Sequence, residues 1–150
     1  MGEGTQVSAG SDLYQEERKV FGSMSIDFKV SSLGTNGGFF VVENTDALKG
    51  GPPRHLHHEQ EEWFYVVEIG DERYRLGPGD SVLAPRKVPH VWAHVGEGTG
   101  RLLVVFQPAG EMEAFFGELA KVEGAPQPEK LRKLFLSHGM EVTGPPLAVE

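Results

Sequence analysis

The stretch from Pro52 to Gly70, PPRHLHHEQEEWFYVVEIG, brings histidines and acidic residues together at the start of an apolar run. It holds three of the six histidines of the chain, and several glutamates follow them directly. The next residues, Trp63 to Val67, are aromatic or β-branched and predict a strand. Because imidazoles and carboxylates are ligands for transition metals, this pattern indicates a candidate metal site.

His55 and His57 are the first candidate ligands. In an extended chain alternate side chains point to the same face, so these two imidazoles face one way and His58 faces the other. Glu62 is the preferred carboxylate ligand because it begins the apolar strand, and Glu61, one residue out of phase, is the alternative. Histidine runs also occur in solvated surface loops, and this stretch alone leaves both interpretations open.

A later stretch supplies another histidine at the start of a strand. His90, Trp92 and His94 alternate along the chain and therefore share one face. If that face points into a β-barrel, His90 completes a site of three histidines and Glu62. His94 would lie further along the same wall, either lining the pocket or packed in the core.

The composition fits one globular domain and argues against several functions. Fourteen basic and 22 acidic residues among 150 give a formal charge of −8, which disfavours nucleic acid and anionic membranes as partners. The chain has no cysteine for disulfides or thiolate catalysis. It has no apolar run of membrane-spanning length, and its N-terminus does not resemble a secretion signal. We therefore expect a cytoplasmic protein.

Short strands separated by glycine- and proline-rich turns dominate the chain and predict an all-β sandwich or barrel. The strands are expected at 25–31, 39–43, 62–69, 72–76, 81–84, 90–95 and 101–107. Gly70 and Asp71 are expected to form a two-residue hairpin turn.

The periodicity becomes helical near the C-terminus. Apolar residues at helical spacing predict two short helices, at 111–122 and 129–138, that cover one end of the β core. Ordered structure is expected to end at 144–146. The chain is thus divided into a mobile tail over 1–11, a β-barrel over 12–107 and a C-terminal helical extension over 108–150.

These residues resemble the two sequence motifs of the cupin superfamily. The first motif contains His-x-His, three or four residues and Glu, which His55, His57 and Glu62 match with four intervening residues. The second contains a proline followed, after four residues, by histidine, which Pro85 and His90 match. The spacing of all four metal-ligand positions is kept.

The sequence departs from these motifs at several other positions. Gly50–Gly51 lie near, but not at, the position of the opening glycine, and Ile69 replaces the closing glycine, with Gly70 next. In the second motif Lys87 replaces a glycine and His94 replaces an asparagine. The connection between the motifs is also short, which leaves one rim of the barrel open or covered by a partner chain.

The resemblance implies a cupin-like jelly-roll barrel, here with two short C-terminal helices, and a homodimer. It also implies one divalent transition metal (Fe, Mn, Ni, Zn or Cu) held by His55, His57, Glu62 and His90. Strand parity within such a barrel suggests four residues as the walls of a pocket for a small-molecule ligand: Phe64, Trp92, His94 and Phe106.

The function expected from this resemblance is a metal-dependent oxidoreductase similar to the quercetinase-like dioxygenases among the cupins. Glu62 would be the catalytic residue, leaving the metal to take a proton. Two alternatives remain open: a non-catalytic module that binds a sugar or another small molecule, and a cupin isomerase or epimerase. A fold of this kind hosts many chemistries and does not choose among them.

Overall fold

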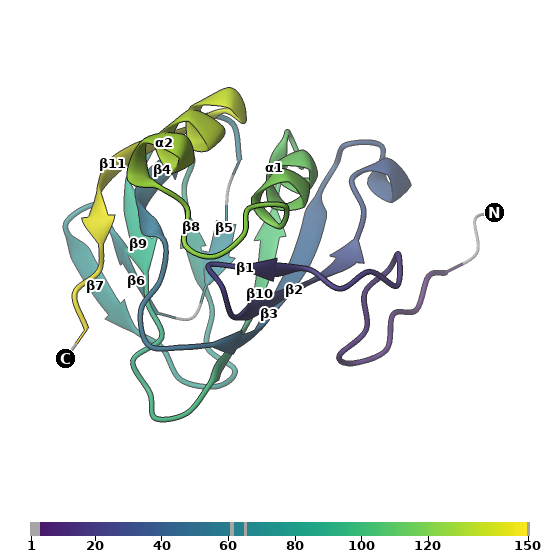
Figure 1. Ribbon diagram of the computed structural model, residues 1–150, viewed down its shortest axis with the longest axis horizontal. Coiled ribbons are helices and arrows are strands. Elements are labelled where there is room, and N and C mark those ends of the chain that lie inside the picture. Colours follow the sequence, from purple (N-terminus) through teal and green to yellow (C-terminus); the bar gives the residue numbers. More distant parts are fainter. Residues whose placement is uncertain (1–3, 61, 65, 150) are drawn as a thin grey trace.

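The computed structural model describes residues 4–60, 62–64 and 66–149, and for residues 62–64 and 66–68 it describes only the backbone. Two large antiparallel sheets face each other (Figure 1). The first sheet has the order β1-β2-β3-β10. Its strands are β1 (Lys19–Val20), β2 (Met24–Val30), β3 (Phe40–Ala47) and β10 (Gly100–Phe106). A 3₁₀ turn, η1 (Leu33–Thr35), links β2 to β3.

The second sheet has the order β11-β4-β9-β6-β7. Its strands are β4 (Pro53–His57), β6 (Val66–Ile69), β7 (Glu72–Arg75), β9 (His90–Trp92) and β11 (Met140–Pro146). A separate pair consists of β5 (Glu62–Phe64) and β8 (Val82–Ala84). The all-β prediction is confirmed, and so is the hairpin turn between Ile69 and Glu72, which are paired.

The stretch predicted as one strand over 62–69 contains β5 and β6, and Tyr65 between them lies outside the described residues. β5 pairs with β8, whereas β6 pairs with β7 and β9 in the second sheet.

The two predicted helices are confirmed as α1 (Met112–Leu119) and α2 (Pro128–Ser137). Both lie at the same end of the sheets (Figure 1). Met112, Phe115 and Leu119 of α1 are buried, as is Phe135 of α2. The helices therefore cover that end of the barrel with their apolar faces.

The last strand was not predicted, although it ends at Pro146, within the stretch where ordered structure was expected to end. β11 runs to Pro146 and pairs with β4, where Met140 lies opposite His57 and Val142 opposite His55. β11 is an edge strand, so prolines without an N–H donor are tolerated in it. The C-terminal segment thus returns to the sheet that carries the histidines.

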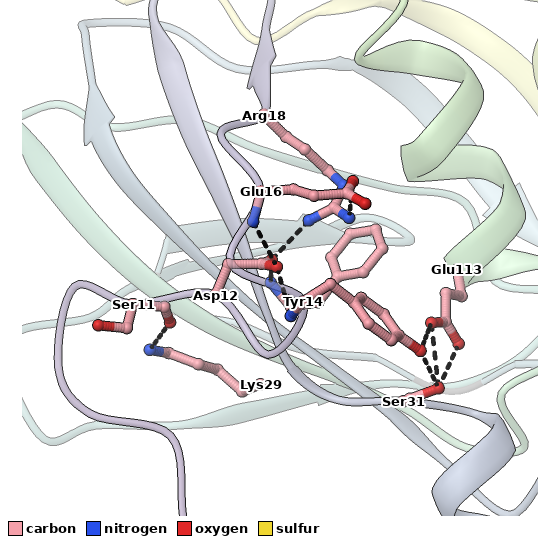
Figure 2. A network of polar contacts seen from close by, with 9 residues as sticks. Ser11, Asp12, Tyr14, Glu16, Arg18, Lys29, Ser31 and Glu113 are labelled. Atoms are coloured by element: carbon pink, nitrogen blue, oxygen red, sulfur yellow. Dashed lines mark hydrogen bonds and ion pairs between the residues drawn. The ribbon is translucent and has the colours of Figure 1, made fainter.

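The N-terminal segment is held on the first sheet from Asp12 onward (Figure 2). The buried Asp12 carboxylate accepts hydrogen bonds from the backbone N–H groups of Phe28, at 2.7 Å, and Tyr14, at 2.8 Å. It also pairs with Arg18, whose guanidinium lies 4.0 Å from the centre of the Phe28 ring. A buried carboxylate is stable in such a place because its charge is paired and hydrogen-bonded.

A second carboxylate, Glu113, ties α1 to the end of β2 (Figure 2). It accepts hydrogen bonds from the Ser31 hydroxyl at 3.1 Å, the Ser32 backbone N–H at 2.8 Å and the Tyr14 hydroxyl at 3.1 Å. Burial alone would raise the pKa of Glu113, but the hydrogen bonds from Ser32, Ser31 and Tyr14 hold the pKa below its usual value.

We expect Glu113→Gln to remove part of the acid sensitivity of the fold. Because the pKa is lowered on folding, the ionised carboxylate stabilises the protein above the unfolded pKa of about 4.3. This stabilisation is lost as the pH falls through the lower, folded pKa. Urea unfolding should therefore show the variant about 1 kcal/mol less stable than wild type at pH 7, with the difference shrinking toward pH 3. The exposed Glu111→Gln is the control, and an equal pH dependence in both variants would contradict the assignment.

Candidate metal centre

Three histidines meet on the inner side of the second sheet. His55 on β4 lies directly opposite His90 on β9, and His57 follows two residues later on the same face as His55. All three are buried, with exposed fractions of 5%, 1% and 1% for His55, His57 and His90. One ligand atom from each lies within 4.8 Å of the other two. The structure thus brings together three of the four ligands expected from the sequence.

Backbone carbonyls orient two of these rings. His55 Nδ1 lies 2.8 Å from the carbonyl oxygen of Pro53, and His90 Nδ1 lies 3.1 Å from that of Val88. In this geometry Nδ1–H donates to the carbonyl, so Nε2 carries the lone pair and is the atom that would bind a metal. The donor set and its orientation fit a divalent transition metal, since imidazole suits Zn, Cu, Fe and Ni alike.

Aromatic rings surround the cluster. The His57 and His90 rings are stacked, with an interplanar angle of 6° and centroids 5.5 Å apart. Phe106 of β10 lies 5.7 Å from His57, and Phe135 of α2 lies 5.0 Å from His55. An apolar surround of this kind limits the access of solvent to a metal and its ligands.

A cavity of about 40 Å³ lies beside His55. Trp92 and Phe106, both expected as pocket walls, line it. Further lining comes from residues that the sequence did not single out as pocket walls: Asn44, Phe115, Phe116 and Phe135. The helical spacing of the three phenylalanines indicated only that they cover the barrel. Asn44 could have been found as the polar residue in phase with Phe40 and Val42.

His94 lies apart from the three clustered histidines. Its backbone pairs with Gly50, and its imidazole packs against Gly96 and Gly100. It borders a different pocket, which Arg75 and Arg101 also line.

The predicted carboxylate ligand and one predicted pocket wall fall within residues 61–68. The side chains of Glu62, Glu61 and Phe64 lie outside the described residues. The backbone of Glu62 is described, and it begins β5 opposite Ala84 of β8. His58, expected on the face opposite His57, has an exposed side chain near Glu141.

The structure explains two of the departures from the cupin motifs. Gly51 passes so close to β9 that a Cβ atom there would lie 1.9 Å from the carbonyl oxygen of Trp92. A glycine is therefore needed at this point, although it is displaced from the expected position. Lys87, at a glycine position of the second motif, has a left-handed φ of 64°. Its N–H donates to the His57 carbonyl at 2.7 Å, so this turn is tied to the cluster.

We expect Lys87→Gly to stabilise the protein by up to about 1 kcal/mol, because a residue with a Cβ is strained in the left-handed region. The gain is limited by the greater freedom of glycine in the unfolded chain. Urea unfolding would measure the difference, and Lys87→Val should shift stability in the opposite direction. The neighbouring Arg86→Gly, at a residue without a positive φ, is the control. A Lys87→Gly variant less stable than wild type would refute the strain argument.

The fold and the cluster define a two-sheet β-barrel with histidines inside one wall. A protein-family model for the cupin domain matches residues 47–106, which include all three clustered histidines. This match, the two motifs and the barrel together support the assignment of residues 47–106 to the cupin superfamily.

Solved structures of the same fold are similar to this chain. KdgF from Halomonas sp. matches with a TM-score of 0.55 and 22% identity, over 67% of this chain and 94% of its own. The polyketide cyclase RemF from Streptomyces resistomycificus matches with 0.54 and 20%, over 70% and 80%. An RmlC-like cupin from Shewanella frigidimarina matches with 0.52 and 20%, over 72% and 97%. At these identities the likeness concerns the fold alone.

No curated protein matches the sequence of this chain. Neither helix of the described residues is long and apolar enough to cross a membrane.

Proposed function

We propose that this cupin is a metal-dependent oxidoreductase of the dioxygenase type that acts on a small molecule. The observation that carries the proposal is the buried cluster of His55, His57 and His90 beside an aromatic cavity. Polar groups clustered at the edge of an apolar pocket are typical of small-molecule sites. The three histidines would hold the metal, and Glu62 is the proposed fourth ligand.

When bound, a divalent metal with open positions supplies Lewis acidity to an oxygen atom of the substrate. The residues of this chain have separate tasks in the proposal. The carbonyls of Pro53 and Val88 fix the rings of His55 and His90. Trp92 and Phe106 keep water from the substrate. Glu62 would accept a proton from a hydroxyl group of the substrate.

The test is aerobic turnover by protein reconstituted separately with Fe, Mn, Ni, Cu or Zn. A flavonol or another enediol is the probe, with oxygen uptake and product mass as the two measurements. We expect turnover with at least one redox-active metal and a loss of about 100-fold or more in Glu62→Gln. Probe recovered chemically unchanged with every metal would contradict the enzyme and leave a binding module. Full activity in Glu62→Gln would refute the proton-transfer role.

The homodimer, the cytoplasmic location and the division of the chain at residues 11 and 107 remain predictions. Light scattering tests the first, since a dimer should have twice the 16.4 kDa mass of one chain.

A further inference from the structure

Asn44 is a buried amide in an otherwise apolar row. On β3 the side chains of Phe40, Val42 and Asn44 alternate toward the interior, and each is at most 2% exposed. Asn44 lies opposite Leu102 of β10 and Ile26 of β2, both of which are buried. Leucine has nearly the same size and would suit the packing of this position better than asparagine does.

The amide oxygen of Asn44 has no hydrogen-bond partner within the described part of the chain. A buried polar atom without a partner costs about 1–3 kcal/mol, so a native structure that retains one calls for an explanation. Asn44 also lines the cavity that His55, Trp92 and Phe106 border. The residue that carries the unused acceptor therefore lines the cavity beside the histidine cluster.

The rest of the cavity wall limits what could satisfy this acceptor. Aromatic rings line it from both sheets and both helices: Trp92, Phe106, Phe115, Phe116 and Phe135. Such rings favour a flat, apolar ligand, and the amide oxygen requires a ligand that donates one hydrogen bond. The volume of about 40 Å³ is small, but Met24, Met112 and Met140 also line the cavity, and methionine side chains repack readily around a guest.

We propose that Asn44 is a ligand-binding residue whose amide oxygen accepts a hydrogen bond from the hydroxyl group of a phenol-type ligand in this cavity. The proposed role of Asn44 rests on the proposed function only in that both use the same cavity. It requires neither the metal nor turnover. Asn44 would select ligands with a donor over ligands of the same shape without one, because only the former satisfy the buried oxygen.

The experiment compares 4-fluorophenol with 4-fluorotoluene, which has a methyl group in place of the hydroxyl. Dissociation constants are measured by ¹⁹F NMR titration on metal-free full-length protein. We expect wild type to bind the phenol about tenfold more tightly than the toluene. In Asn44→Leu this preference should vanish or reverse, while the protein without ligand stays at least as stable as wild type.

Two further variants keep the test decisive. Asn44→Ala removes the acceptor without adding bulk, should Asn44→Leu not fold. Met112→Leu changes the cavity wall without changing a hydrogen bond, and it should alter the affinity for both probes to a similar extent. The proposal is overturned if wild type binds neither probe or prefers neither. It is also overturned if the preference survives in the Asn44 variants. Because no metal is present, failure of the oxidoreductase assay would leave this result standing.

Discussion

Replacement of His57 by alanine is expected to lower metal affinity by more than about 100-fold. His57 is 1% exposed, and its ligand atom lies within 4.8 Å of those of His55 and His90. Loss of a residue that merely orients a ligand typically costs 10–100-fold, and loss of the ligand itself should cost more. Elemental mass spectrometry of tag-free protein should find about one metal per chain in wild type and almost none in His57→Ala.

His58→Ala is the matched control for this experiment. His58 is the next residue in the chain, but its side chain is 47% exposed. The His58→Ala variant should retain the metal content of wild type, whereas His90→Ala should lose the metal as His57→Ala does. Wild type without metal after reconstitution with each candidate ion would refute the metal centre. Retention in both His57→Ala and His90→Ala would show that the metal binds elsewhere.

Metal binding should also stabilise the fold, because a ligand that binds only the folded state shifts the unfolding equilibrium. The three histidines come from β4 and β9, which have only one paired position, His55 with His90. An ion held between these strands would therefore reinforce a short contact inside the second sheet. For the same reason, we expect the stability of the molecule to be sensitive to changes in the backbone around β4 and β9.

The site could be predicted from the sequence where local spacing determines it. His55 and His57 share a face because the side chains of a strand alternate, and the motif spacing indicated His90 as their partner. Most strands were found for the same reason, since alternation and turn residues are local signals. The backbone tie from Lys87 to the His57 carbonyl was not visible, because nothing in a lysine indicates a left-handed turn.

Features that depend on distant parts of the chain could not be predicted in this way. β11 joins the sheet beside β4 although its sequence contains two prolines, which do not indicate a strand. Phe135 reaches His55 only because α2 folds back over the barrel end, and helical spacing does not say what a helix covers. The unpartnered oxygen of Asn44 likewise follows from the apolar neighbours that two other strands supply.

Gly51→Ala is expected to destabilise the protein by about 3 kcal/mol or more. The new methyl group would lie 1.9 Å from the Trp92 carbonyl oxygen and 3.2 Å from the Cα atom of Ala93. These are backbone atoms next to β9, so no side-chain rotation relieves the clash, and the start of β4 must move away from β9. Because His55 and His90 face each other across these strands, metal affinity should fall together with stability.

Gly34→Ala provides the control, since a Cβ atom at Gly34 meets nothing within 4 Å and its φ is not left-handed. Urea unfolding should place Gly34→Ala within about 0.5 kcal/mol of wild type. If Gly51→Ala were as stable as Gly34→Ala, the close approach of the Gly51 backbone to the Trp92 carbonyl would be refuted. If it were unstable yet bound metal with the wild-type affinity, β4 and β9 would not be held in place by this glycine. The displaced glycine of the first motif would then have a structural role separate from the histidine cluster.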